Sequence, residues 1–193
     1  MQAKSTGRTV TETARRAQII DAAIRVIADV GLARATFTRI ARSAGLSSTG
    51  LISYHFADRA ELLDATVERV LADFSAFVLA RPDDGSARGA LIAFCESNVD
   101  FMGAHPDHMS VLMQVRADLA GDADLRRRDT RELAELLRRG RSEGVFGEID
   151  PMLTAGFILS MRDGLIRDIG QSADVPACRR AYVAATLSIV EGK

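Results

Sequence analysis

The stretch Thr38–Glu61, TRIARSAGLSSTGLISYHFADRAE, decides the fold of this chain. Helical spacing predicts one short helix over residues 39–44, where small and apolar side chains can pack inward. Gly45 can take the left-handed conformation that ends a helix, and a second short helix is expected over residues 49–55. Two short helices around a glycine turn form a helix-turn-helix, whose second helix enters the major groove of DNA.

Hydroxyl and carboxyl side chains mark where the helices of this segment begin. Thr38 is expected to cap the first helix, and Ser47 or Ser48 can cap the second by accepting a backbone N–H. Asp58 is expected to cap a longer third helix, and Glu61 stands three positions later, at the spacing of a capping box.

The segment resembles the DNA-binding region of the TetR family of bacterial transcriptional repressors. The resemblance covers about Ala14 to Leu63 and includes the preceding helix, RRAQIIDAAIRVIADVG. Its TGLIS portion is also similar to the betaine-pathway repressor branch of that family. The turn before TGLIS is one residue longer than the common pattern, so Ser47, Ser48 and Thr49 each remain open as a helix cap or as a base-facing residue.

Side-chain chemistry predicts roles on the two short helices. A helix N-terminus at Thr38 and the cation of Arg39 suit phosphates. Thr49 and Ser53 can form hydrogen bonds with base edges, and Gly50 lets the backbone approach them closely. Nine residues are expected to contact DNA, and three of them rest on the family resemblance. They are Thr38, Arg39, Ser48, Thr49, Gly50, Ser53, Tyr54, His55 and Arg59.

The resemblance supplies three of these roles. It implies that Tyr54 and His55 form a phosphate-clamping aromatic pair, and that Arg59 stands where the family usually has a phosphate-binding lysine. The alternative for Tyr54 is an aromatic side chain that fills the domain core. Core packing is the role expected for Leu51, Ile52 and Phe56.

Charge is distributed unevenly along the chain. The net charge is −1 overall, but residues 1–60 carry nine basic and four acidic side chains, whereas residues 61–193 carry sixteen and twenty-two. A positive end attracts phosphates through counterion release, so nucleic acid is expected to bind the N-terminal part.

Composition predicts a soluble, all-α protein. The 193 residues are rich in Ala, Leu and Arg, contain four prolines, and show no strand pattern, no signal peptide and no apolar run long enough to span a membrane. Cys95 and Cys178 are isolated, which is typical of buried free thiols in a reducing compartment, so a cytoplasmic location is expected.

Two domains are expected. Residues 1–57 would form the helix-turn-helix domain with a flexible N-terminal arm, and residues 58–193 a helical regulatory and dimerisation domain. A connector helix over residues 58–80 would join them through an apolar stripe. The stripe consists of Leu63, Val67, Val70, Phe74 and Phe77.

Small residues recur every four positions at Gly156, Ser160 and Gly164. They would clear a groove for close helix packing and predict a homodimer interface. The resemblance implies the same, because the last two helices of each TetR-family chain pair into a four-helix bundle. The alternative is tight packing within one subunit.

Soft apolar side chains and a few polar ones predict a pocket for a small, largely apolar effector. Ordinary core packing is the alternative. His105 and His108 are three residues apart, but no set of carboxylates or thiols completes a metal site, so no metal and no cofactor are expected. The expected ligand-binding residues are Phe94, Asn98, Met102, His105, Met109, Met113, Arg116 and Met161.

These observations favour a ligand-responsive regulator, most simply a repressor that binds a palindromic DNA operator as a dimer. A helical enzyme is the first alternative, but the sequence lacks a nucleophile–base pair, a phosphate loop and paired carboxylates in an apolar context. A module that keeps the helix-turn-helix only as a scaffold is the second, and the exposed basic and hydroxyl residues argue against it.

Overall fold

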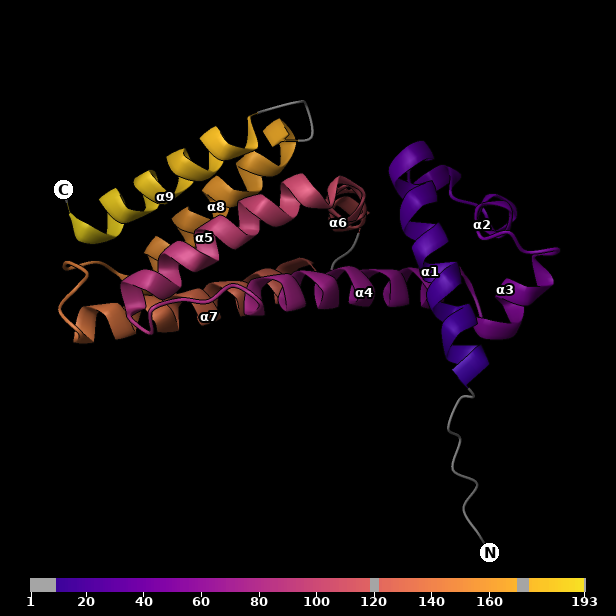
Figure 1. Ribbon diagram of the computed structural model, residues 1–193, viewed down its shortest axis with the longest axis horizontal. Coiled ribbons are helices and arrows are strands. Elements are labelled where there is room, and N and C mark those ends of the chain that lie inside the picture. The colour runs from indigo at the N-terminus through magenta and orange to yellow at the C-terminus, as the bar shows by residue number, and fades with distance from the viewer. Residues whose placement is uncertain (1–9, 119–121, 170–173, 193) are drawn as a thin grey trace, which may run out of the picture. The chain divides into compact units, whose positions relative to one another are not determined.

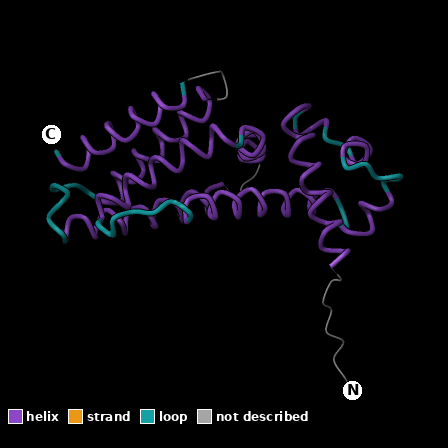
Figure 2. Tube along the Cα trace, viewed as in Figure 1, coloured by secondary structure: helices purple, strands orange, loops and turns teal. Residues whose placement is uncertain are grey.

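The protein is all-helical throughout the part described by its computed structural model, which is residues 10–118, 122–169 and 174–192 (Figures 1 and 2). The expected all-α fold is therefore confirmed. The elements are α1 (Val10–Val30), the short 3-10 helix η1 (Leu32–Arg34), α2 (Phe37–Ser43), α3 (Gly50–His55), α4 (Arg59–Leu79), α5 (Ala87–Ala104), α6 (Pro106–Asp118), α7 (Asp122–Ser142), α8 (Pro151–Ile169) and α9 (Val175–Glu191).

The chain divides into two compact units. The first consists of residues 1–72 and 110–117, and the second of residues 73–109 and 118–193. The chain thus passes from one unit to the other within α4 and again at α6. This division differs from the one expected from sequence, because the first unit includes most of α4 and a distant piece of α6.

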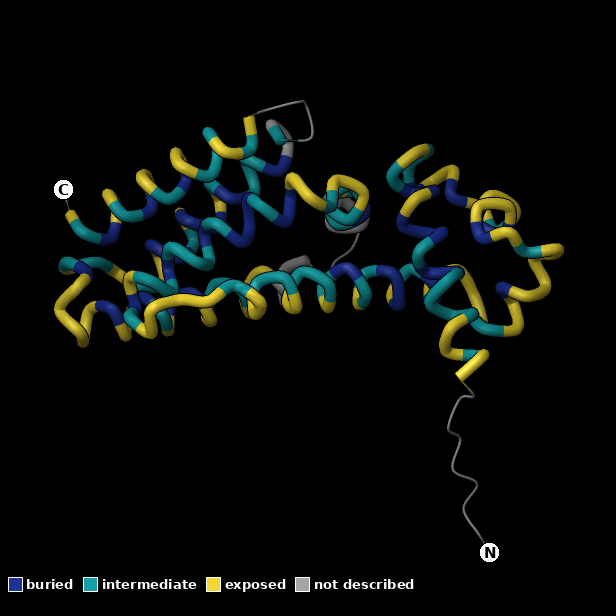
Figure 3. Tube along the Cα trace, in the orientation of Figure 1, coloured by how far each residue is buried: buried dark blue, intermediate teal, exposed yellow. Residues whose placement is uncertain are grey.

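The first unit is built around α1. One side of this helix is apolar and buried (Figure 3), with Ile19 and Ala23 fully buried and Val26 nearly so. Helix α1 packs against η1, α2 and α3. It ends at Gly31, whose φ of 85° lies in the region that favours glycine.

Residues of α6 complete this unit from far along the chain. Val111 is fully buried in the same core as α1. The Gln114 side chain accepts a hydrogen bond from the Leu32 amide at 2.6 Å and donates one to the Ile27 carbonyl at 3.2 Å. One amide side chain therefore satisfies two backbone groups where α1 ends.

The buried side of α4 differs from the expected stripe. Asp58 caps the helix as predicted, accepting from the Glu61 amide at 2.9 Å. Leu62 and Thr66 are buried, whereas Leu63 and Val67 are only half-buried. The Thr66 hydroxyl donates to the Leu62 carbonyl at 2.7 Å, so a polar side chain satisfied by its own helix occupies the inner face.

The second unit is arranged around α5, which contacts α7, α8 and α9. Asp150 caps α8, since its carboxylate accepts from the Leu153 amide at 2.8 Å. Arg81, which follows α4, forms ion pairs with Glu96 and Asp100 of α5, and Arg179 of α9 also reaches Asp100. These charged contacts join three segments around α5.

The two cysteines are free, as expected. Cys95 is buried, and its thiol lies 3.6 Å from the Thr186 hydroxyl. Burial raises the pKa of Cys95 to about 12, so its thiol stays protonated and unreactive at neutral pH. Cys178 is only half-buried, which differs from the burial expected of it.

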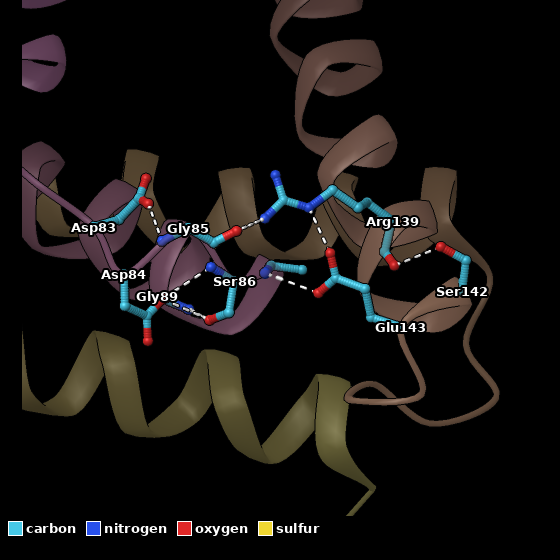
Figure 4. Close-up of polar contacts among 9 residues, drawn as sticks. Asp83, Asp84, Gly85, Ser86, Gly89, Arg139, Ser142 and Glu143 are labelled. Atoms are coloured by element: carbon cyan, nitrogen blue, oxygen red, sulfur yellow. Dashed lines mark hydrogen bonds and ion pairs between the residues drawn. The ribbon is translucent and has the colours of Figure 1, made fainter.

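Carboxylates of two segments surround the N-terminus of α5 (Figure 4). Asp84 accepts from the amide and the hydroxyl of Ser86, and the Ser86 hydroxyl accepts from the Gly89 amide at 2.9 Å. Glu143, just after α7, accepts from the Ala87 amide at 3.0 Å. A Cβ at Gly89 would lie 1.9 Å from the Asp84 carboxylate, so a side chain at this position would displace that carboxylate.

These hydrogen bonds lower the pKa of both acids. The Ser86 hydroxyl lowers the pKa of Asp84, and the Ala87 amide lowers that of Glu143, helped by Arg139. A carboxylate whose pKa is lower in the folded state stabilises the fold above its unfolded pKa, and that stabilisation is lost as the pH falls through the folded pKa. At neutral pH both carboxylates are therefore ionised and stabilise the N-terminus of α5.

Candidate nucleic-acid interface

Helix α2 begins one position before Thr38. Thr36 has extended backbone angles, and its hydroxyl accepts from the Arg39 amide at 3.4 Å, so Thr36 is the cap. The assignment of this cap to Thr38 is wrong, because Phe37 already has helical geometry and Thr38 lies in the first turn. Thr38 and Arg39 are both exposed.

The turn between α2 and α3 has the form expected of its glycine. Gly45 has a φ of 65°, its amide donates to the Arg42 carbonyl at 3.1 Å, and the Leu46 amide donates to the Ala41 carbonyl at 2.9 Å. This pair of bonds is a Schellman motif, which satisfies carbonyls at the end of a helix. It fixes the direction in which the chain enters α3.

Helix α3 has no side-chain cap. Its first flanking residue is Thr49, and no side-chain hydrogen bond closes this N-terminus, so the expected capping by Ser47 or Ser48 is wrong. Ser48, Thr49 and Ser53 are exposed, and within the described ranges their hydroxyls form no hydrogen bond. These hydroxyls therefore remain available to a partner.

Glycine at position 50 is not required by the packing of the protein. A Cβ there would meet only the Ser48 hydroxyl, at 3.5 Å, an ordinary contact. Ile52 and Phe56 are buried as expected, but Leu51 is 37% exposed, so its assignment to the core is wrong. A helix of six residues turns only a narrow face inward, and the spacing of Ile52 and Phe56 defines that face.

The two aromatic side chains at the end of α3 lie differently. Tyr54 is 72% exposed, which rules out the core-filling alternative, and its hydroxyl donates to Glu12 at 3.3 Å. The ring of His55 is half-buried and meets the Tyr54 ring edge-on at 5.1 Å. Arg59 is exposed, but one of its N–H groups donates to the Leu32 carbonyl at 2.6 Å.

Arg16 of α1 holds the end of α3, a contact that sequence reasoning missed. Its guanidinium donates to the His55 carbonyl at 2.5 Å and to Glu61 at 3.0 Å, and it lies 3.9 Å from the centre of the Phe56 ring. The other carboxylate oxygen of Glu61 accepts from the Ala57 amide at 2.7 Å. Arg16 therefore joins α1 to the junction of α3 and α4.

A second missed contact holds the end of α2. The Gln18 side chain donates to the Ala44 carbonyl at 2.6 Å. Both Arg16 and Gln18 lie one helical turn or less before the buried Ile19 and Ile20 of α1. Polar residues at the edge of a buried stripe are the only sequence signal that could have pointed to them.

The residues of the expected effector pocket are spread over both units. Phe94, Asn98, Met102 and His105 lie along α5 and its C-terminus, and the Asn98 amide donates to the Phe94 carbonyl at 2.8 Å. Asn98 and Met102 are buried, whereas Phe94, His105, Met109 and Met161 are half-buried. Met113 is exposed and belongs to the first unit, and the side chain of Arg116 lies outside the described residues.

A cavity of about 830 Å³ in the second unit is lined by other residues, which include Phe77, Arg81, Ile92 and Glu96. His108 lies 3.1 Å from the carboxylate of Asp73. Across the described ranges, no three metal-ligating side chains come together. Among the described helices, none combines the length and the apolar composition needed to cross a bilayer.

The small residues of α8 lie on an open face. A Cβ at Gly156 or at Gly164 would meet no atom within 4 Å, which contradicts tight packing within the subunit. Ser160 is exposed, and its hydroxyl donates to the Gly156 carbonyl. Leu153 and Phe157 are 59% and 55% exposed beside them, so the face is apolar as well as open.

Comparison with known proteins finds similar sequences for the N-terminal part of the chain. Residues 19–66 match the family model of bacterial regulatory proteins of the tetR family. The HTH-type transcriptional regulator BetI 2 of Chromohalobacter salexigens is 45% identical over 92 residues, which are 46% of this chain and 44% of that protein. BetI of Cronobacter sakazakii is 42% identical over 94 residues, 47% of this chain and 46% of that protein. These alignments span about half the length of the curated relatives.

Solved structures extend the similarity of fold to nearly the whole chain. A TetR-like transcriptional regulator from Rhodococcus sp. RHA1 has a TM-score of 0.78 at 22% identity, covering 93% of this chain and 97% of that one. A TetR transcription regulator from Haloarcula marismortui has a TM-score of 0.77 at 20% identity, covering 92% and 98%. Residues 19–66 therefore match the tetR family, and the chain as a whole shares the fold of these solved regulators.

Replacing Arg16 by Met should destabilise the first unit, because the His55 carbonyl and Glu61 lose a charged donor while the apolar contact with Phe56 is kept. Hydrogen bonds to charged groups contribute about 1.5–3 kcal/mol. Urea unfolding of Arg16→Met measures this loss. The matched control is Arg69→Met, which breaks a more exposed ion pair with Asp21 that is worth under about 1 kcal/mol. Equal losses in the two variants would contradict the role of Arg16.

Proposed function

We propose that this protein is a transcriptional regulator that binds duplex DNA through α2 and α3. It acts as a homodimeric repressor on a palindromic operator and is released by a small, largely apolar effector. Such a protein acts in the cytoplasm, where it meets chromosomal DNA. The curated relatives bear the names of transcriptional regulators, which favours this function over a helical enzyme or an interaction module.

The observation that carries the proposal is the outer face of α3. Ser48, Thr49 and Ser53 present hydroxyls that the described part of the protein does not use, beside a glycine that its packing does not require. Hydroxyls can donate to or accept from base edges, and the Thr49 methyl can contact a thymine methyl. Arg39 and the exposed Tyr54 flank this face as phosphate contacts.

Thr49→Val and Ser53→Ala should change which sequences are bound, because each removes a polar group from the base-reading face. A lost base contact reduces discrimination by about 1–3 kcal/mol. Sequencing of duplexes that the wild type retains from a random pool supplies the operator, and binding of matched and mismatched duplexes gives the discrimination. Ser75→Ala, an exposed change on α4, is the control. A wild type that retains no preferred sequence would overturn the proposal.

Dimer formation is proposed through α8 and α9. The open face of Gly156, Ser160 and Gly164 is bordered by exposed Leu153 and Phe157, and such an apolar face is stabilised when a second copy covers it. Two-fold symmetry would then place two copies of α3 on half-sites about 34–36 Å apart, or a multiple of that distance.

Gly156→Leu should shift the protein toward monomer, because a bulky side chain forces closely packed helices apart at a cost of about 1–3 kcal/mol. The same side chain meets no atom of its own subunit near its Cβ, so folding should be retained. Sedimentation at several concentrations measures the change, with Ser75→Leu as control. A wild type that sediments as a monomer at micromolar concentration would rule out the dimer.

The effector is proposed to bind beside α5, among Phe94, Asn98 and Met102 of that helix. Ser97 on the same helix is fully buried, and in the described part of the chain its hydroxyl has no partner. An unpaired buried hydroxyl is costly, and a polar atom of a ligand would satisfy it. A largely apolar molecule with one polar group fits these requirements.

An effector that releases DNA must bind more weakly when operator is present, because coupling between two sites is reciprocal. The expected difference in ligand affinity is about 5–150-fold. A ligand found by thermal-shift screening would be titrated with and without saturating operator, and the Ser97→Ala variant would be titrated beside it. Equal affinities in the two titrations would show that the ligand is not an inducer.

A further inference from the structure

A basic notch lies between α1 and α2 in the first unit. It encloses about 390 Å³ and is lined by three arginines, Arg25 of α1 and Arg39 and Arg42 of α2. Asp29 is the single acid of the lining. Arg25, which neither the sequence pattern nor the family resemblance points to, is thereby placed beside the two exposed arginines of the helix-turn-helix.

These three guanidiniums are largely unused by the protein. Within the described residues, the side chains of Arg39 and Arg42 form no hydrogen bond or ion pair, and Arg25 has only a 3.5 Å contact with the Ser43 carbonyl. By contrast, Arg16 and Arg59 in the same unit are bonded to backbone carbonyls at 2.5 and 2.6 Å. Unpaired arginines around a concave surface favour an anionic ligand with several acceptor oxygens.

The position of the notch points to the source of that anion. In a helix-turn-helix the first helix crosses the DNA backbone while the second lies in the groove. Arg39 and Arg42 are three residues apart on α2 and therefore share one side of it. That side carries the notch, so its arginines are suited to the backbone rather than to the base edges.

We propose that Arg25, Arg39 and Arg42 form a phosphate-binding site that holds one backbone phosphodiester of duplex DNA. The proposal rests on the proposed function and adds Arg25, from outside the helix-turn-helix, to the residues that position the protein on DNA. Phosphate contacts of this kind add affinity for every sequence and set the register of the recognition helix. Asp29 weakens the site, because its carboxylate repels the phosphate.

The test measures binding of a random-sequence duplex over a range of salt concentrations. The slope of log K against log salt is negative, and loss of one phosphate contact makes it shallower by about 0.9. Arg25→Ala should show the shallower slope. Arg25→Lys should keep a slope close to that of the wild type, because lysine keeps the charge. Arg138→Ala, at an exposed position of α7 in the other unit, removes the same charge away from the notch and should leave the slope unchanged.

Asp29→Asn provides a change of opposite sign. Removing the one acid of the notch should tighten binding of the random duplex at low salt, a gain that misfolding could not produce. If Arg25→Ala keeps the wild-type slope, or if Asp29→Asn binds no more tightly than the wild type, the proposal is wrong. Failure of the wild type itself to bind any duplex would overturn the proposed function together with this inference.

Free phosphate compounds share the same chemistry and are separated by two further measurements. Ethylation of individual phosphates in a duplex selected by the wild type should block wild-type binding at one position per half-site, and Arg25→Ala should lose that interference. Titration with inorganic pyrophosphate is the second measurement. An Arg25-dependent pyrophosphate site in a protein whose ethylation pattern does not depend on Arg25 would assign the notch to a small anion and overturn the DNA contact.

Discussion

Helix α3 depends on an arginine that belongs to another helix. Helix α3 has only six residues and no side-chain cap, and so it cannot be stable by itself. Arg16 binds the carbonyl of its last residue, contacts the Phe56 ring that follows, and pairs with Glu61, which in turn accepts from the Ala57 amide. The buried face of α3 and Arg16 together hold the helix in place, so the outer face of α3 is not needed for its stability.

The first unit therefore separates polar groups that hold the fold from polar groups that remain unused. Arg16, Gln18 and Gln114 satisfy backbone carbonyls or amides at helix ends, where unpaired groups would be costly. The hydroxyls of Ser48 and Thr49, in contrast, form no bonds within the described ranges. A surface that is rigid in its backbone and unpaired in its side chains is suited to a polar partner, because little conformational freedom is lost on binding.

Local sequence signals predicted the helices well, but they did not predict contacts between residues far apart in the sequence. The cap at Asp58 was predicted because a cap acts within three residues of its own position. The cap of α2 was wrongly assigned to Thr38 because Thr36, two residues earlier, is an equally good capping residue. Leu51 was wrongly assigned to the core because a short helix shows little periodicity. Sequence spacing could not place Gln114, whose partners in α1 and η1 lie more than eighty residues away.

The Gln114 contact also limits how this protein can be recombined with others. A chimera that joined residues 1–72 to the second unit of another protein with this fold would lack Val111 and the side-chain amide that satisfies Leu32 and Ile27. Its first unit would carry an exposed apolar patch and an unpaired buried amide. A transplantable module consequently consists of two segments of sequence, residues 1–72 and 110–117, and the second must be grafted with the first.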